Sequence, residues 1–511
     1  MPKLTVNHDD RATVIPFEGM PVLSFVLKQY GLLHTAPCGG KGICGKCRMQ
    51  TAGCLSEPEP DERKCLAPTE LNHGMRLACQ ARLTGDASVI LPKAAELINI
   101  QSDGYLPPFP HSPMQGRFGV AADIGTTTLA LKLIDLQNGR VLETVTSANP
   151  QGGIAADVIG RIEAALNGEG SRLQKLAAGE MERLMYELCQ HCGILMNDIG
   201  PMVVTGNTTM LYLLTGKNPA ALSRAPFQAD CLFGYWTDAG SIGFSKNPEI
   251  EIYLPACVSA FVGADITCGV LASQMCTHPE TSLLVDLGTN GEIALWHQEK
   301  LYCCATAAGP AFEGGNIGSG AGSVPGAIDR VYVEDGMLRH TTLGNRKPVG
   351  ICGSGLIDAV AGLLQLGLVD ETGLMASGEV FISEEISLTQ KDIRNLQLAK
   401  GAIAAGIKTI CRHVGISVQD ITTLYIAGGF GSHVDIENAA AIGLIPRELM
   451  GKTVVLGNAP LTGAVMLLLQ QGFESDTMLS TRRAISIPLG GSGIFAEKYI
   501  ECMMFEINSN E

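Results

Sequence analysis

The sequence predicts a multidomain protein with a small α+β unit at its start, followed by a larger α/β unit made of two similar halves. Its 511 residues exceed the roughly 100 to 200 residues of a common single domain. The segment QSDGYLPPFPHSPMQGR at 101–117 is rich in proline and polar residues, which indicates a linker. Farther along, DIGTTTLAL at 123–131 is echoed by DLGTNGEIAL at 286–295. We therefore expect a small domain at 1–95, a linker at 96–116, and two lobes at 117–280 and 281–511.

The composition is that of a packed globular protein, with 46% hydrophobic and 17% charged residues. The net charge of −15 disfavours binding to nucleic acid, because a grip on phosphate backbones needs clustered Lys and Arg. No apolar run reaches the roughly 18 to 20 residues that cross a bilayer, and the start MPKLTVNHDDRAT has no apolar signal core. We expect no membrane partner and a cytoplasmic location.

Four of the 17 cysteines form a pattern near the start of the chain. Cys38, Cys44 and Cys47 stand as C-x5-C-x2-C, and Cys79 follows in RLACQ. Structural zinc sites usually pair two C-x2-C knuckles, and only one is present. Three ligands on a glycine-rich loop plus one distant ligand instead predict a [2Fe–2S] cluster, because glycines let the backbone wrap the inorganic sulfides.

Two further cysteines, Cys54 and Cys65, lie between the third and fourth predicted ligands and leave the choice of thiols open. All thirteen cysteines outside the pattern, Cys54 and Cys65 as well as the neighbours Cys303 and Cys304, are expected to be ordinary small core residues. The stretch from Gly40 to Lys46 also fits G-x4-G-K, but Cys47 follows where a phosphate loop needs Ser or Thr. We therefore reject a phosphate loop there.

The residues around these cysteines predict the elements of a small domain. Two alternating apolar runs flank a turn within 4–19, a helix is expected over 22–31, and ASVILP at 87–92 reads as a closing strand. Together with the cysteine spacing, residues 1–95 resemble a β-grasp [2Fe–2S] ferredoxin.

The repeated segment of the larger part predicts an apolar strand, a Gly-Thr turn and a second strand in each half. Such a turn presents backbone N–H groups and hydroxyls to phosphate oxygens, and an Asp at the strand end can hold Mg²⁺ through water. We expect Asp123 and Asp286 to face each other across a cleft as the catalytic pair. The predicted phosphate contacts are Gly125, Thr126, Thr127, Thr128, Gly288, Thr289 and Asn290.

Other glycine-rich segments are candidate nucleotide contacts or hinges. An apolar strand at 424–427 leads into Gly428, Gly429, Phe430 and Gly431, which would let the backbone pass close to a nucleoside. Gly353, Ser354 and Gly355 are expected at the start of an amphipathic helix. We expect 309–322 to form a loop over the cleft, and 205–210 and 457–472 to connect the lobes.

The two Asp-Gly-Thr turns and the glycine segments resemble the actin, sugar kinase and Hsp70 superfamily, in which two lobes clamp ATP. The order DIGTTT, GICGSGLIDAV, IAGGFGSHVD behind a ferredoxin-like start resembles the reductive activators of corrinoid proteins over nearly the whole chain. That resemblance implies an ATP-hydrolysing enzyme that passes one electron to a corrinoid protein and converts inactive Co(II) to Co(I) in a methyltransferase system. It also implies an upstream electron donor and a homodimer.

Three other functions remain open from the sequence. Activators of 2-hydroxyacyl-CoA dehydratases share the ATP lobes, but they bridge two subunits with a [4Fe–4S] cluster, whereas the cysteines here lie in a separate domain. A small-molecule kinase with a ferredoxin sensor would need a general base and a substrate pocket that the sequence does not assign. A redox-gated binding module would use ATP only as a conformational clamp.

Overall fold

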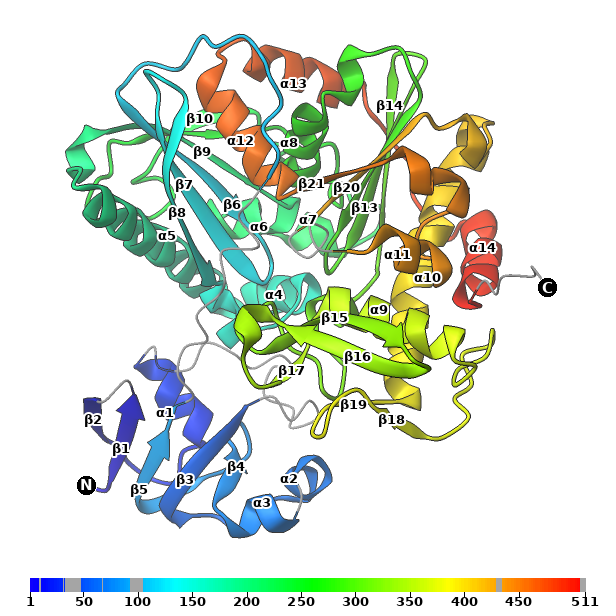
Figure 1. Cartoon of the computed structure of the whole chain (residues 1–511). Helices are drawn as coiled ribbons and strands as arrows, with labels where there is room; N and C mark the ends of the chain where they lie inside the picture. The colour runs from blue at the N-terminus through cyan, green and yellow to red at the C-terminus, as the bar shows by residue number, and fades with distance from the viewer. Residues whose placement is uncertain are drawn as a thin grey trace.

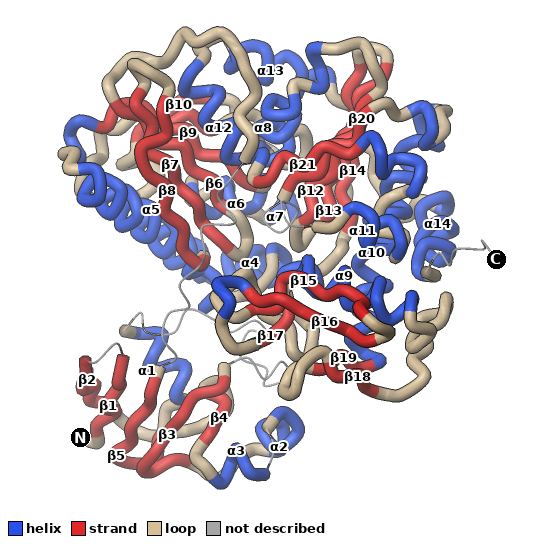
Figure 2. The backbone as a smooth tube through the Cα atoms, in the orientation of Figure 1, coloured by secondary structure: helices blue, strands red, loops and turns tan. Residues whose placement is uncertain are grey.

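The computed structural model contains a small N-terminal domain, here called the head, and two larger lobes (Figures 1 and 2). The described residues are 1–8, 11–30, 32, 47–66, 68–91, 104–428 and 434–505. In this part of the chain no helix is both long enough and apolar enough to cross a membrane.

The head (residues 1–91) is a five-stranded sheet covered by one helix, in the strand order β2-β1-β5-β3-β4. Strand β1 pairs parallel with β5, and the other pairs are antiparallel. This is the predicted β-grasp fold, and it forms because alternate apolar residues such as Leu4, Val6 and Ile15 point into one core with α1. Its elements are β1 (Lys3–His8), β2 (Arg11–Pro16), α1 (Leu23–Gln29), β3 (Arg48–Leu55), α2 (Pro60–Cys65), α3 (Pro68–Asn72), β4 (Met75–Leu77) and β5 (Leu83–Ile90).

The first lobe is built on a six-stranded sheet in the order β10-β11-β9-β6-β7-β8. Its central strand β6 is almost entirely apolar because both faces are buried. The long helix α5 packs against β7 and β8, as Figure 1 shows. The elements are β6 (Phe118–Ile124), β7 (Thr128–Asp135), β8 (Arg140–Ala148), α4 (Val158–Ala164), α5 (Gly170–Cys192), β9 (Ile199–Gly206), α6 (Thr208–Leu214), α7 (Ala220–Ser223), β10 (Tyr235–Asp238) and β11 (Glu251–Leu254).

The second lobe repeats this plan with the order β21-β20-β12-β13-β14-β22. Helices α9, α10, α11 and α14 pack on one side of the lobe (Figure 1). The sheet strands are β12 (Ser282–Leu287), β13 (Gly291–His297), β14 (Lys300–Thr306), β20 (Thr423–Ala427), β21 (Thr453–Gly457) and β22 (Ile485–Ser486). The helices are α9 (Gly353–Gln365), α10 (Gln390–Val414), α11 (Ile436–Ala441), α13 (Phe473–Arg483) and α14 (Gly493–Met503).

The second lobe also contains smaller sheets. A three-stranded sheet in the order β16-β15-β17 packs on α9, and a two-stranded sheet pairs β18 with β19. Their strands are β15 (Ala327–Glu334), β16 (Met337–Thr342), β17 (Gly350–Ile351), β18 (Glu379–Phe381) and β19 (Ser387–Thr389).

Two helices lie at the junction of the lobes, α8 (Ala264–Ser273) and α12 (Ala459–Leu469), and they pack closely on each other. A Cβ on Gly463 would lie only 2.1 Å from the carbonyl oxygen of Cys268, so the two backbones touch at this point. Helix α12 also packs on β6 and β9 of the first lobe. The small residues of 457–472 therefore allow this contact with α8, a helix that the sequence did not predict as part of the connection. That 205–210 and 457–472 act as the hinge between the lobes stays a prediction.

The predicted repeat forms two equivalent hairpins. Asp123 pairs with Ala130 across β6 and β7, and Asp286 pairs with Glu292 across β12 and β13. Strands β6 and β12 each have a parallel neighbour on the other side, β9 and β20 respectively. The chain therefore places both Asp-Gly-Thr turns at the same kind of sheet edge.

Candidate functional site

A cleft between the lobes brings most of the predicted ATP-site residues together. Both hairpin turns line it, and each strand-end aspartate lies behind its own turn. The predicted residues that line the cleft are Asp123, Gly125, Thr126, Thr127, Thr128, Asp286, Gly288, Thr289, Asn290, Gly353 and Gly428.

Some predicted contacts do not reach this cleft. Ser354 is buried and donates a hydrogen bond to the Asp329 carbonyl at 2.9 Å. Gly355 packs against β15, where an added Cβ would lie 2.3 Å from the Ile328 carbonyl oxygen. Of the helix start 353–355, only Gly353 lines the cleft. Gly429, Phe430 and Gly431 lie outside the described residues.

The first turn is held from behind by side chains of three separate segments. Asn149 donates its amide to the Gly125 carbonyl at 2.8 Å, and Asn207 donates to the Thr126 hydroxyl oxygen at 3.2 Å. The buried Arg161 of α4 donates to the Thr126 carbonyl at 2.5 Å. Its remaining donors reach the Ala155 carbonyl and the Gln151 side chain. This network fixes the backbone of the turn.

The second turn is held mainly by the segment that follows its hairpin. The backbone N–H of Gly309 donates to the Thr289 carbonyl at 2.8 Å, and the Thr289 hydroxyl donates to Glu313 at 2.7 Å. Glu313 ends the short 3-10 helix η6 (Pro310–Glu313). Residues 309–322 thus contribute Phe312, Glu313, Ala321 and Gly322 to the cleft, in line with the expected loop over it.

Five acidic side chains line the cleft, Glu313 and a group of four others: Asp123, Asp265, Asp286 and Glu292. Burial, and then the neighbouring Asp265 charge, raise the pKa of Asp123 to about 7 and that of Asp286 to about 8. Burial raises the pKa of Asp265 to about 6, and burial with the Asp265 and Asp286 charges raises the pKa of Glu292 well above its usual value. Such a cluster favours a cation, because each carboxylate is otherwise buried beside like charges.

The chemistry of these donors fits Mg²⁺ held largely through water. Among the residues that the structure describes, no three His, Cys, Asp or Glu side chains are arranged to hold a metal ion directly. Magnesium usually keeps several of its waters and takes one or two carboxylates together with substrate phosphates. The arrangement is therefore suited to a magnesium nucleotide.

Six polar residues of the cleft were not predicted as site residues from the sequence: Asn207, Asp265, Glu292, Glu313, Ser323 and Asn458. Asp265 lies in the first turn of α8, two residues after Gly263, which caps that helix. Glu292 occupies the repeat position of Ala130, so a register alignment of the two hairpins marks it as an unusual polar residue. Asn458 begins α12 and donates to Asp123 at 3.2 Å, a contact that only the fold reveals.

In the head, two of the four predicted cluster ligands are described. Cys47 precedes β3 and Cys79 follows β4; both sulfur-bearing residues are buried, and the Ala78 N–H donates to the Cys47 carbonyl at 2.9 Å. The Gln80 amide points to the Cys79 sulfur at 3.7 Å. Cys38 and Cys44 lie outside the described residues.

The alternative thiols differ in their surroundings. Cys54 is exposed on β3 and lies seven residue steps along the extended chain from Cys47, which corresponds to about 23 Å. A single cluster could not use both. The expectation that the other cysteines are core residues is right for Cys303 and Cys304 but wrong for Cys54. Cys65, at the end of α2, is half-buried against the head core.

Known proteins share this arrangement over most of the chain. A family model described as the C-terminal domain of RACo, the ASKHA domain, matches residues 280–511, and one described as the RACo middle region matches residues 118–278. The corrinoid activation enzyme RamQ of Eubacterium limosum is 33% identical over 422 residues, covering 76% of this chain and 71% of that protein.

Two further similarities agree with these. The [Co(II) methylated amine-specific corrinoid protein] reductase of Methanosarcina barkeri is 28% identical, covering 71% of this chain and 72% of that protein. A solved structure titled reductive activator for corrinoid,iron-sulfur protein is 27% identical, with a TM-score of 0.71 over 99% of this chain and 98% of that one.

The fold and the cleft define a two-lobed ATP-binding protein of the actin and sugar kinase type, joined to a ferredoxin-like head. The similarities then specify the family. This chain belongs to the reductive activators of corrinoid proteins. They favour this family over the dehydratase activators, the small-molecule kinases and the binding module that the sequence left open.

Proposed function

We propose that this protein uses ATP to drive single electrons from its head to the cobalt of a corrinoid protein, so that inactive Co(II) becomes Co(I) and a methyltransferase system regains activity. The observation that carries the proposal is the facing pair of Asp-Gly-Thr turns in a chain that also carries the C-x5-C-x2-C head. Relatives named as corrinoid activation enzyme and corrinoid protein reductase support the acceptor.

The cluster that we propose is of the [2Fe–2S] type and is held by Cys38, Cys44, Cys47 and Cys79. When bound, it stores one electron and releases it to the acceptor. The chain's own contribution is to bury Cys47 and Cys79 together and to direct the Gln80 amide at the Cys79 sulfur. A hydrogen bond to a ligating sulfur is one of the means by which proteins tune such centres.

We propose that ATP lies in the cleft between the two lobes, with its phosphates between the two turns. Asp123 and Asp286 would hold Mg²⁺ through water, and the ion would neutralise phosphate charge and orient the terminal phosphate. Thr126, Thr127, Thr289 and the turn N–H groups would donate to phosphate oxygens. Gly353 and Gly428 would lie along the nucleotide.

Energy input is required because the electron moves uphill. Plant-type [2Fe–2S] centres lie near about −400 mV, and an acceptor ~200 mV lower makes the step unfavourable by about 4 to 5 kcal/mol. We propose that ATP binding and hydrolysis change the closure of the lobes and thereby the affinity for the corrinoid partner. Which step ATP drives is the question for the experiment.

The remaining features are also part of the proposal. An upstream one-electron donor must reduce the head, since hydrolysis of ATP supplies no electron. A homodimer is suggested by the family alone. A cytoplasmic location is supported by the use of ATP and by the need for reduced thiols.

The test combines the anaerobic protein, an electron donor and a Co(II) corrinoid protein in a stopped-flow spectrometer. We expect Co(I) to accumulate only when ATP and Mg²⁺ are present. Equal extent and turnover of Co(I) without ATP would refute the coupling.

Variants test the proposed ATP site and the proposed cluster site independently. Asp286→Ala should abolish ATP turnover and keep the visible absorbance of the cluster, whereas Cys44→Ala should lose the cluster and keep ATP turnover. Cys54→Ser is the matched control, since its exposed thiol lies about 23 Å along β3 from Cys47. If the Asp286 and Cys44 variants both reduced the partner normally, both site assignments would be wrong.

A further inference from the structure

Glu313 joins the two phosphate turns directly. The Thr127 hydroxyl of the first lobe donates to one carboxylate oxygen at 2.6 Å, and the Thr289 hydroxyl of the second lobe donates to the other at 2.7 Å. Thr127 and Glu313 are 186 residues apart in the sequence. One carboxylate therefore accepts from two of the three threonine hydroxyls that the proposed function assigns to phosphate, those of Thr127 and Thr289.

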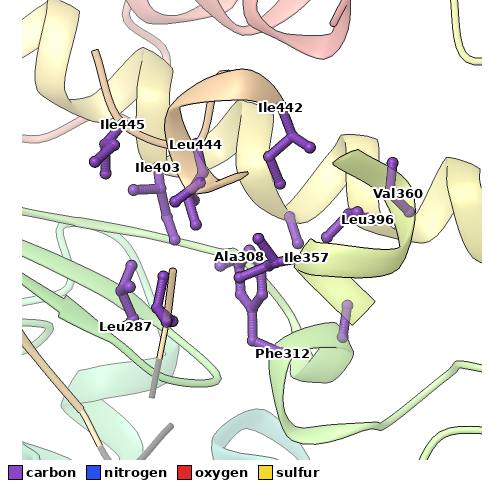
Figure 3. Close-up of a cluster of buried hydrophobic side chains, with 14 of the residues drawn as sticks. Leu287, Ala308, Phe312, Ile357, Val360, Leu396, Ile403, Ile442, Leu444 and Ile445 are labelled. Atoms are coloured by element: carbon purple, nitrogen blue, oxygen red, sulfur yellow. The ribbon is translucent and has the colours of Figure 1, made fainter. Parts of the chain in front are cut away.

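The loop that carries Glu313 is attached to the second lobe. Phe312, the preceding residue, is buried among Ala308, Ile357 and other apolar side chains of that lobe (Figure 3). The Gly309 N–H donates to the Thr289 carbonyl at 2.8 Å. Glu313 is thus fixed to the second turn, and its bond to Thr127 crosses between the lobes.

The far end of the same loop is attached to the long helix α10. The Gly318 N–H donates to the buried Asp392 carboxylate at 2.7 Å, and Asn395 donates to the Asn316 carbonyl at 2.6 Å. A displacement of Glu313 would therefore pull on a segment that is anchored at both ends within the second lobe.

A carboxylate and a phosphate cannot use these hydroxyls at the same time. Each threonine hydroxyl has a single proton to donate, and charged acceptors form the stronger hydrogen bonds. A phosphate group between the turns would also be repelled by the Glu313 charge at short range. The group that lies between both turns is expected to be the terminal phosphate, which is farthest from the adenosine and which ADP lacks.

We propose that Glu313 distinguishes ATP from ADP: the terminal phosphate of ATP displaces the Glu313 carboxylate from Thr127 and Thr289, whereas ADP leaves both hydrogen bonds in place. The inference rests on the proposed nucleotide site. Glu313 is then a specificity-determining residue, because ATP binding must break the Thr127 contact between the lobes and ADP binding need not.

The first experiment measures the affinity of the full-length anaerobic protein for ADP and for the non-hydrolysable ATP analogue with a β,γ-imido bridge, each with Mg²⁺, by titration calorimetry. In Glu313→Gln we expect the analogue to bind about tenfold more tightly and ADP to change by less than about twofold, because only the analogue meets the carboxylate. Glu299→Gln is the control, since it removes the same charge from an exposed turn of the same lobe.

The outcomes are distinct. An equal gain for both nucleotides would show a general charge effect and overturn the inference, and so would weaker binding of the analogue to Glu313→Gln. If the wild-type protein bound neither nucleotide, the proposed function itself would fail.

A second measurement needs no variant. Hydrogen exchange of the wild-type protein should change within residues 309–322 when the ATP analogue is added and should stay as in the nucleotide-free protein when ADP is added. The same response to both nucleotides, or no response to the analogue, would overturn the inference.

Discussion

The two phosphate turns join corresponding strands, and the first is longer by one residue, but the larger difference lies in their surroundings. The first is fixed by buried donors, among them the Arg161 guanidinium on the Thr126 carbonyl. At the base of the second turn, the Thr306 hydroxyl donates a hydrogen bond between neutral groups to the Gly291 carbonyl. Thr289 of this turn is hydrogen-bonded to the loop at 309–322. The first turn is thus held mainly by buried groups of its own lobe, whereas the second is held by the loop at 309–322, which we propose that nucleotide displaces. Glu313 of that loop reaches the first turn only through the Thr127 hydroxyl.

The largest effect on ATP turnover should come from the strand-end aspartate that each of the two turns has. Asp123→Asn and Asp286→Asn should each lower ATP turnover by about 10³-fold, because each removes a carboxylate that we propose holds the magnesium nucleotide. Phosphate release measures the rate, and an unchanged visible spectrum of the head serves as the control. Near-normal turnover in only one of the two variants would show that the turns are not equivalent in chemistry.

Stability should reveal where the turns differ. Arg161→Met should lower the free energy of unfolding by about 3 kcal/mol, because the Thr126 and Ala155 carbonyls lose a charged donor in a buried site. Urea unfolding followed by the fluorescence of Trp236 and Trp296 reports on both lobes.

The control for this variant is Arg172→Met, which removes an exposed ion pair with Glu169 and should change stability by less than about 0.5 kcal/mol. A loss below about 1 kcal/mol in Arg161→Met would contradict a rigid first turn.

The acidic residues of the cleft should make the stability of the protein depend on pH when nucleotide and magnesium are absent. The pKa values of Asp123 and Asp286 are raised from 3.8 to about 7 and about 8 in the folded protein. The folded state therefore holds more protons than the unfolded state. The contribution of these two carboxyl groups to the folding stability is present below about pH 4 and is lost as the pH rises through 7 and 8.

We expect the melting temperature in chelator to fall between pH 5.5 and 8.5, and to fall less in Asp286→Asn, whose amide does not titrate. An equal pH dependence in the two proteins would exclude Asp286 as a contributor.

The smallest change in the free energy of unfolding is expected at the base of the second turn. Thr306→Val should lower the free energy of unfolding by about 1 kcal/mol, since it leaves the Gly291 carbonyl without the hydroxyl at 3.0 Å. The same urea unfolding measures it beside Arg161→Met. A loss as large as that of Arg161→Met would remove the contrast between the turns.

The sequence predicted those parts of the site that depend on short stretches of chain. The two strand, turn and strand repeats formed as expected, because continuous apolar runs and Gly-Thr turns are properties of neighbouring residues. The start of α9 was also predicted, but two of its three candidate residues are buried against β15 and not in the cleft. A helix pattern predicts the element and does not say which side of its first turn meets a ligand.

The sequence by itself determined the family, the two turns and the spacing of the cysteines, since each is written in adjacent residues. The tertiary structure alone decided that Glu313 would lie between Thr127 and Thr289, that Asp265 would stand among the other carboxylates, and that Cys54 would be exposed far along β3 from Cys47. The physical reason is that such contacts join segments from about 20 to 186 residues apart, or depend on which face of a strand meets the core. Only the packing of whole lobes sets both.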